Sequence, residues 1–304
     1  MKSKIGVVIT TYNRLDKLKI ALEAYNNQLL KPDYIIVVNN ASTDNTTEFL
    51  EYWKIVPSVS KKIVIEMEYN AGGSGGFYAG EQYAMQLEDI DWVLIADDDA
   101  YPEKDYLKGL FDYIEKNGKE NISIVCGSVK ELGAQENIHR TYLKSKWSRY
   151  FQKYVPEIDY SKKELYPDFV SYVGILINKL KLEKVGLVNK EYFIWYDDTE
   201  HSQRLKQVGD IVCLPRYRIV HDVAGENLEL SWKNYYGFRN NVDFFKKHFK
   251  LQMPFVVAVT IAKALLCPLK GKSFTESKLR LIAIKDGLLG NLGKHPIYKP
   301  GWKP

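Results

Sequence analysis

The chain has 304 residues, 45% of them hydrophobic and 27% charged, which fits one large globular domain with a smaller appendage and excludes a disordered or fibrous chain. Its three cysteines form no CxxC pair, which argues against a disulfide framework and against a zinc site. The first residues turn polar too soon for a secretory leader, so we expect a cytoplasmic protein.

The net charge of +5 is unevenly distributed. Residues 246–304 hold eleven lysines and one arginine against two acidic residues, a net charge of +10, and residues 1–245 therefore carry −5. A basic tail on an acidic body indicates an anionic partner. Because no nucleic-acid-binding motif is present, we expect an anionic membrane surface and no nucleic acid.

Short β-branched segments and helical patterns alternate through the first hundred residues. The strands are expected at residues 4–12, 33–42, 61–69 and 91–100, and the helices at 14–28, 43–53 and 79–88. This alternation predicts a mostly parallel, doubly wound α/β sheet, in which ligands bind beyond the carboxyl ends of the strands. Four polar clusters follow those ends, at residues 10–14, 39–44, 70–76 and 97–99.

The later sequence is less regular. Strands are expected at residues 122–129, 169–180 and 210–222, a loop leading into a helix at 187–209, and helices after residue 232. Residues 140–160 have no pattern that assigns them. We therefore expect a domain of residues 1–230 followed by a helical region of residues 231–304.

An acidic triplet, Asp97 to Asp99, follows the apolar strand "WVLIA". Alternate residues of a strand point the same way, so Asp97 and Asp99 can share a divalent cation while Asp98 faces a ligand hydroxyl or the backbone. The alternative is an ordinary solvated turn. The position of the triplet at the end of a buried strand favours the cation.

Five glycines lie between Tyr69 and Gly80, in "YNAGGSGGFYAG". The segment matches neither the dinucleotide-binding pattern nor the phosphate loop that ends in Gly-Lys-Ser/Thr. Glycine permits close backbone approach, so we expect a loop that wraps a diphosphate or a sugar and leads into a helix. The residues expected to contact this ligand are Asn70, Gly72, Gly73, Gly75 and Gly76. The alternative is a flexible surface loop.

These motifs together resemble a known family. "VVITTYNR", "IIVVNNASTDNT", the triplet and the later pair in "YFIWYDDTEHSQRL" resemble the GT-A fold inverting glycosyltransferases of family 2. With "NAGGSGGFYAG" and "IVHD", the chain looks more narrowly like the galactofuranosyltransferases, which use UDP-galactofuranose. The likeness covers about residues 3 to 245, and related rhamnosyltransferases share much of it. It implies a GT-A catalytic domain with a helical C-terminal extension.

The resemblance also implies roles for individual residues. The uridine would be held by Thr11, Arg14, Asn39, Asn40 and Asp44, although the family commonly has Asp where this chain has Asn39. Mn²⁺ or Mg²⁺ would be held by Asp97, Asp99 and His221, with Asp97 and Asp98 also at the donor. Such a cation suits a leaving nucleotide diphosphate.

Inversion at the anomeric carbon requires one base for the acceptor hydroxyl. The resemblance implies Asp198 as that base, and the acceptor would contact Trp195, Tyr196, Asp197 and Glu200. The alternative reading of these acids is helix capping. An apolar stretch at residues 253–269, flanked by "KKHFK" and "LKGK", is too short to span a bilayer and is expected to lie in its interface. It could instead pack on the protein or pair subunits.

The expected reaction transfers galactofuranose to a lipid-linked glycan at the inner face of the cell membrane. Two alternatives stay open from the sequence. One is a rhamnosyltransferase using dTDP-rhamnose, and the other is a catalytically silent nucleotide-sugar-binding scaffold subunit.

Overall fold

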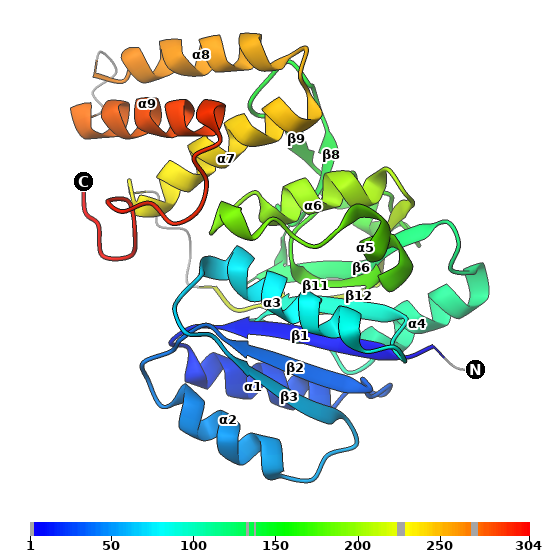
Figure 1. Ribbon diagram of the computed structural model, residues 1–304. Helices are drawn as coiled ribbons and strands as arrows, with labels where there is room; N and C mark the ends of the chain where they lie inside the picture. Colours follow the sequence, from blue (N-terminus) through cyan, green and yellow to red (C-terminus); the bar gives the residue numbers. More distant parts are fainter. Residues whose placement is uncertain (1–2, 132–133, 137, 224–228, 269–272) are drawn as a thin grey trace.

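A large mixed sheet forms the centre of the protein in the computed structural model, which describes residues 3–131, 134–136, 138–223, 229–268 and 273–304 (Figure 1). The strand order is β3-β2-β1-β4-β11-β6-β12-β5, with β7 paired to β6. The strands are β1 (Ile5–Thr11), β2 (Tyr34–Asn39), β3 (Lys61–Glu66), β4 (Trp92–Asp97), β5 (Ala100–Pro102), β6 (Ile122–Glu131), β7 (Ala134–Glu136), β11 (Val173–Asn178) and β12 (Asp210–His221).

The first four of these strands run parallel, as the sequence predicts, with β1 between β2 and β4. Strand β11 is antiparallel to both β4 and β6, so the sheet is mixed beyond β4. β1, β2 and most of β4 are completely buried, because helices cover both faces. Their near-continuous apolar sequences follow from that double burial.

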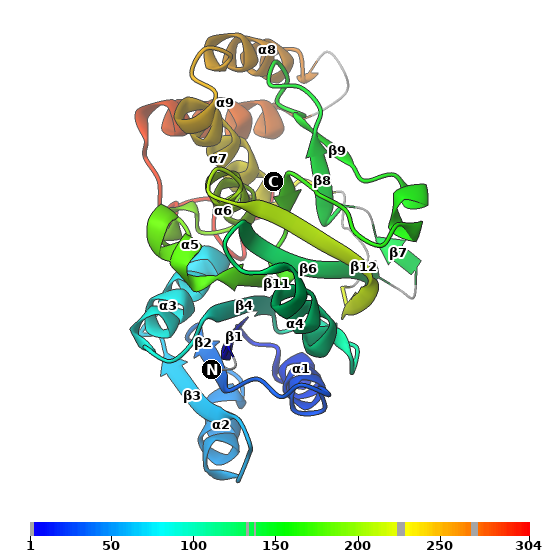
Figure 2. The same ribbon diagram turned by 90° about the vertical axis from the view of Figure 1, so that its right-hand side faces the viewer.

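The helices divide between the two faces (Figure 2). One core cluster joins the sheet to α1 (Leu15–Asn26), α2 (Thr46–Ile55) and α4 (Tyr106–Asn117). The other joins it to α3 (Gly72–Gln86), α5 (Lys179–Val185) and α6 (Asp197–Lys206). Two short 3₁₀ helices, η1 (Glu157–Ser161) and η2 (Lys190–Tyr192), complete this part.

The glycine-rich segment is not the loop that the sequence predicts. The expected helix at 79–88 begins already at Gly72, so most of the glycines lie inside α3. A Cβ atom at Gly76 would clash with Thr10, and one at Gly80 would clash with Val8. The glycines thus let α3 lie close against β1, which outweighs their low helix propensity.

Residues 140–160, which the sequence leaves unassigned, contribute to a second, three-stranded sheet. Its order is β10-β8-β9, formed by β8 (Arg140–Leu143), β9 (Gln152–Tyr154) and β10 (Phe169–Val170). Phe151, beside β9, stacks on Phe244 of α7 with ring centroids 4.9 Å apart. Irregular short strands of this kind carry too little periodicity to be predicted.

The C-terminal region is helical, as expected, with α7 (Trp232–His248), α8 (Met253–Leu265) and α9 (Phe274–Leu289). The last residues fold back, and Tyr298 stacks on Tyr235 of α7 with ring centroids 4.9 Å apart. The flanking "LKGK" motif, residues 269–272, lies outside the described residues. Among the helices that are described, none has both the length and the apolar character needed to cross a membrane.

Candidate active site

The ends of β1, β2 and β4 meet at one edge of the sheet, as expected for parallel strands. Thr10 at the end of β1 is paired in register with Val38 of β2 and Asp97 of β4. Just past the strand ends, Asn13 and Ala41 adopt positive φ angles of 53° and 60°. Left-handed backbone in residues other than glycine is a mark of functional turns.

Asp98 and Asp99 of the acidic triplet are held by residues from β1 and the turn after it. Thr11 Oγ1 donates to Asp98 Oδ2 at 2.7 Å. Arg14 Nη1 donates to Asp98 Oδ1 at 3.1 Å and to Asp99 Oδ2 at 2.6 Å. Thr11 and Arg14, expected at the uridine, therefore lie against the triplet.

Asp97, Asp99 and His221 come together although more than one hundred residues separate the histidine from the triplet. Their candidate ligand atoms all lie within 4.8 Å of one another. His221 Nε2 is 3.4 Å from Asp99 Oδ1, and that buried oxygen has no hydrogen-bond partner among the residues described. Two carboxylates and an imidazole suit Mn²⁺ or Mg²⁺, and the unpartnered oxygen fits such a cation.

The protonation of Asp97 and His221 is consistent with a cation site. Burial and the charge of Asp99 raise the pKa of Asp97 to about 8. Burial lowers the pKa of His221, but Asp99 and Asp97 outweigh it and raise the pKa to about 9. Asp97 and His221 therefore retain protons, and these protons supply positive charge where a divalent cation would neutralise the same carboxylates.

His221 is oriented by a further carboxylate, Glu131, which no sequence motif indicates. Glu131 Oε1 lies 2.7 Å from His221 Nδ1 and 2.9 Å from His139 Nε2, and His139 Nδ1 lies 2.7 Å from Ser171 Oγ. Glu131, His139 and His221 also form a group with metal-ligand spacing. Since one oxygen of Glu131 serves both imidazoles, we assign it to orienting His221 with Nε2 toward the aspartates.

The predicted nucleotide-side residues mostly bond within the protein. Asn39 Nδ2 donates to Thr47 Oγ1 and Glu66 Oε2, and Asp44 Oδ1 accepts from the amide of Thr46 at the start of α2. Asn40 Nδ2 donates to the Gly72 carbonyl at 2.8 Å, and its Oδ1 accepts from the Ala71 amide. Asn39 and Asp44 thus shape the turn, while Asn40 ties it to α3.

The glycines expected around the diphosphate separate into two kinds. Gly75 and Gly76 are buried against neighbouring atoms, and Gly72 (φ +76°) lies against Phe193, so the side of each glycine where a Cβ would stand faces the protein. Gly73 is different, since a Cβ there would meet nothing within 4 Å. Asn70 Oδ1 accepts from the Gly72 amide at 2.8 Å. Gly73 therefore has open space beside it at the amino end of α3.

The second acidic centre stands on a strained loop before α6. Phe193, Trp195 and Tyr196 have φ angles of 67°, 63° and 70°. This conformation delivers Asp197 and Asp198 into the first turn of α6. Burial and the charge of Asp197 raise the pKa of Asp198 to about 7, and burial also raises that of Asp197. A carboxylate with this pKa is suited to general-base work near neutral pH.

The glycine helix also touches this loop. The Ser74 amide donates to the Phe193 carbonyl at 3.3 Å, two residues after Gly72, whose carbonyl accepts from Asn40. The start of α3 therefore lies between the β2 turn and the Asp197–Asp198 loop. This contact sets the spacing of the two halves of the candidate site.

Two residues of α7 that the sequence did not indicate hold the strained loop. Asn240 Nδ2 donates to the carbonyls of Tyr192, Ile194 and Trp195 at 3.0, 3.1 and 2.9 Å. Arg239 Nη2 donates to the Tyr192 carbonyl at 3.0 Å. Because buried carbonyls need partners, these side chains keep the loop in its left-handed form.

We expect Asn240→Ala to lower the free energy of unfolding by about 2 kcal/mol or more, because it leaves buried carbonyls unpaired. Urea unfolding measures the change. Asn291→Ala, which removes an exposed amide bonded to Asp286 at 3.1 Å, is the matched control and should change little. Equal stability of the two variants would show that Asn240 does not hold the loop.

The residues expected to bind the acceptor differ in their exposure and in their contacts within the protein. Trp195 is 44% exposed and can meet a ligand. Tyr196 packs in the cluster around Phe151 and Phe244, and its hydroxyl accepts from Asn241 Nδ2, so less of its side chain is left for the acceptor.

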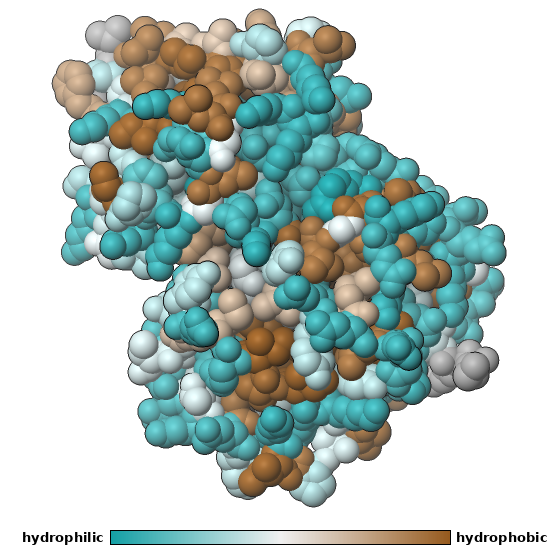
Figure 3. Space-filling view, in the orientation of Figure 1, coloured by the Kyte–Doolittle hydropathy of each residue, from teal (hydrophilic) through white to brown (hydrophobic). Residues whose placement is uncertain are grey.

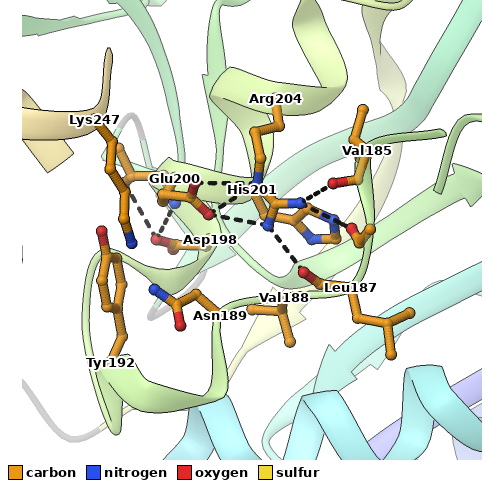
Figure 4. Close-up of polar contacts among 12 residues, drawn as sticks. Val185, Leu187, Val188, Asn189, Tyr192, Asp198, Glu200, His201, Arg204 and Lys247 are labelled. Carbon is orange, nitrogen blue, oxygen red and sulfur yellow. Dashed lines mark hydrogen bonds and ion pairs between the residues drawn. The ribbon is translucent and has the colours of Figure 1, made fainter. Parts of the chain in front are cut away.

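Glu200, also expected at the acceptor, is buried and bonds to side chains of the protein. Its Oε1 lies 3.0 Å from His248 Nε2, and both its oxygens accept from Arg204. Figure 4 shows Arg204 joining Glu200 to the backbone carbonyls of Val185 and Leu187. These contacts outweigh burial and lower the pKa of Glu200 to about 2, so it stays a fixed anion in this network.

Lys233, at the start of α7, is a further cation near the site. Burial and the charge of Arg14 lower its pKa, while Asp97 and Asp99 act in the opposite direction. The charges of Asp97 and Asp99 therefore act on its ammonium group. A lysine there can meet a diphosphate, and only the folded chain reveals it.

Comparison with known proteins agrees with this geometry. The chain is 27% identical over 208 residues to galactofuranosyltransferase GlfT1 of Mycolicibacterium smegmatis, covering 67% of this chain and 66% of that protein, just under two thirds of its length. It is 24% identical to dTDP-rhamnosyl transferase RfbF of Shigella flexneri, covering 96% of this chain and 98% of that one.

Solved structures share the fold. The crystal structure of GalNAc-T7 with UDP, GalNAc and Mn²⁺ matches 94% of this chain and 56% of that chain, with a TM-score of 0.66 and 15% identity. TarS residues 1–349 of S. aureus match 84% of this chain and 70% of that chain, with a TM-score of 0.55 and 16% identity. These neighbours confirm the predicted GT-A fold.

A family model described as "Glycosyl transferase family 2" matches residues 6–172, which is more than half of the chain. That range contains β1, the turn after β2, the glycine helix and the acidic triplet. With the fold and the two acidic centres, it identifies the chain as a glycosyltransferase that belongs to glycosyl transferase family 2.

Proposed function

We propose that this glycosyltransferase moves galactofuranose from UDP-galactofuranose to a hydroxyl of a lipid-linked glycan, with inversion and with a divalent cation, in the synthesis of a cell-surface polysaccharide. The observation that carries the proposal is the pairing of two acidic centres, Asp97–Asp99–His221 and Asp197–Asp198, on either side of the start of α3. The likeness to galactofuranosyltransferase GlfT1 supports the donor.

The residues divide the chemistry between them. Asp97, Asp99 and His221 would hold Mn²⁺ or Mg²⁺, which when bound supplies positive charge to the leaving diphosphate. Lys233 and the open backbone at Gly73 would add donors to the phosphates. Asp198 would accept the proton of the attacking hydroxyl, with Asp197 and Trp195 at the acceptor. The Mn²⁺ that accompanies UDP in the GalNAc-T7 structure supports the choice of cation.

We expect Glu131→Gln to weaken Mn²⁺ binding by about 10–100-fold, because the variant loses the charge that orients His221. Titration followed by electron paramagnetic resonance measures free Mn²⁺ directly, without a turnover assay. Glu157→Gln, an exposed change outside the site, is the control. Unchanged Mn²⁺ affinity in Glu131→Gln would leave Glu131 as a structural residue only.

The runner-up donor is dTDP-rhamnose, and one observation favours it. The similarity to the rhamnosyl transferase of Shigella flexneri extends over nearly the whole length of both chains. A catalytically silent scaffold subunit is the alternative of another class. The raised pKa of Asp198 weighs against it, since a scaffold that only binds the donor has no use for a general base.

The test is nucleotide release from a panel of UDP- and dTDP-sugars with Mn²⁺ and a polyprenyl-linked glycan acceptor. Release of UDP from UDP-galactofuranose alone supports the proposal. Preference for dTDP-rhamnose keeps the mechanism and replaces the donor. Donor binding without release from any sugar, with several acceptors, would favour the scaffold.

We further propose that residues 1–230 form the catalytic domain and that residues 231–304 associate it peripherally with the inner face of the membrane, where a lipid-linked acceptor would be reached. The basic charge of that region supports this location. Pairing of subunits through the same region is the alternative, and it is separated from membrane binding below.

A further inference from the structure

Helix α8 presents an apolar face that the rest of the protein does not cover. Val256, Val257, Thr260 and Ala264 face inward and are buried. On the opposite side Leu251, Phe255, Leu265 and Leu266 are exposed, and Phe255 and Leu265 are 52% and 59% accessible. Brown side chains accordingly gather over α8 and α9 at the top of Figure 3.

A segment distant in sequence joins this face. The turn between β8 and β9 lies beside α8 in both ribbon views (Figures 1 and 2). Trp147 of that turn is 56% exposed, and its ring contacts Phe255 edge-on with centroids 6.0 Å apart. Tyr150 is also exposed, and Lys263 Nζ lies 5.3 Å from the centre of its ring. We call Leu251, Phe255, Leu265, Leu266, Trp147 and Tyr150 the α8 surface.

Lysine side chains border the α8 surface, and no acidic residue lies close to them along the chain. Lys250 and Lys263 are exposed on the α8 side, and Lys146 is exposed on the turn, with its Nζ 5.5 Å from the Phe249 ring. No Asp or Glu occurs in residues 139–156 or 244–275. Two separate acid-free segments therefore make up one surface.

We propose that the α8 surface, which includes Trp147 and Tyr150 of the β8–β9 turn, docks the protein on an anionic lipid bilayer. Apolar side chains with Trp and Tyr among them and Lys at the border suit the membrane interface, where aromatic rings lie at headgroup level. Each lysine adds attraction to anionic lipid. The proposal narrows the expected membrane contact from the whole basic tail to one helix. It adds a second contact, the turn between β8 and β9, which lies within residues 1–230.

A second copy of the chain is a poorer occupant of the α8 surface. In a twofold-symmetric dimer the same patch meets itself, so the lysines of one protomer approach those of the other. Like charges brought together in this way are repelled, and no carboxylate of the two acid-free segments is there to separate them. An anionic bilayer neutralises the same lysines.

Vesicle sedimentation tests the proposal, with phosphatidylcholine vesicles that contain or lack phosphatidylglycerol. Wild type is expected to sediment with the anionic vesicles and to be released by salt. Lys146→Gln/Lys250→Gln/Lys263→Gln should bind them roughly 100-fold more weakly, at about fivefold per lysine. Phe255→Ser/Leu265→Ser should also bind more weakly.

The control is Ile55→Ser/Val59→Ser, which removes exposed apolar side chains near α2 at the opposite end of the molecule (Figure 1). It should bind vesicles as wild type does. Thermal unfolding and UDP binding show whether each variant is folded. Trp147 should report insertion by a blue shift of fluorescence with anionic vesicles that Trp147→Phe lacks.

Three results would overturn the proposal. They are absence of binding by folded wild type, equal binding by wild type and Phe255→Ser/Leu265→Ser, and a dimer in analytical ultracentrifugation that Phe255→Ser/Leu265→Ser dissociates. The proposal deepens the peripheral location in the proposed function, yet vesicle binding needs neither donor nor metal. Its failure would leave transfer to a soluble acceptor intact, and failure of transfer would leave vesicle binding intact.

Discussion

Asp198→Asn is expected to lower the rate of sugar transfer by about 10²–10⁴-fold, the usual contribution of a positioned general base. The amide keeps the shape of the carboxylate but cannot accept the proton of the attacking hydroxyl. Binding of UDP and of Mn²⁺ should persist, because the groups assigned to them are Asp97, Asp99 and His221. Single-turnover transfer beside calorimetric UDP binding measures the two properties separately.

The same base predicts the pH dependence of wild type. Burial and Asp197 raise the pKa of Asp198 to about 7, and a base must be deprotonated to act. Transfer measured as kcat/KM should therefore fall with decreasing pH below about 7 and level off above it. Asp112→Asn, an exposed change on α4, serves as the control and should keep the wild-type profile. Undiminished transfer by Asp198→Asn would remove Asp198 as the base.

Removal of the cation is expected to abolish transfer, and Asp99→Ala should lower it by about 10²-fold or more even with excess Mn²⁺, since charge neutralisation of this kind contributes several kcal/mol. Without a cation, a diphosphate would face the carboxylates of Asp97 and Asp99 directly. Arg14 partly offsets that charge through its contacts to Asp98 and Asp99. The loss is therefore one of donor binding as well as of rate.

A chelator series followed by readdition of Mn²⁺ measures this dependence in wild type. Activity should return with Mn²⁺ in wild type and not in Asp99→Ala. Asp89→Asn, which alters an exposed pair with Lys4 away from the site, is the matched control. Full activity in the presence of chelator would contradict the metal proposal and leave Arg14 and Lys233 to neutralise the diphosphate.

The class of fold and the family could be predicted from the amino-acid pattern. Alternation of short β-branched segments with amphipathic helices requires a parallel sheet, and the strand ends then have to share one edge. The triplet Asp97–Asp99 is readable for the same reason, because its place after "WVLIA" depends only on neighbouring residues. Local pattern is sufficient wherever the determining contacts are local.

The glycine segment shows where local pattern fails. A glycine has no side chain, and that property serves a flexible loop and a closely packed helix equally well. Only the position of Thr10 and Val8 under α3 decides for the helix. Likewise, Tyr196 and Glu200 look free in sequence, and their partners Phe244 and His248 lie about 48 residues away.

The assembly of the candidate site was decided by tertiary structure alone. Asn240 stabilises a loop that begins 48 residues before it, and Glu131 orients a histidine 90 residues after it. Likewise, Trp147 contacts Phe255 of α8, although the two residues are far apart in the sequence. A sequence states which groups are present and how they repeat along the chain. Which distant groups meet depends on how the layers pack, because hydrogen bonds and ion pairs act over a few ångströms of space regardless of separation along the chain.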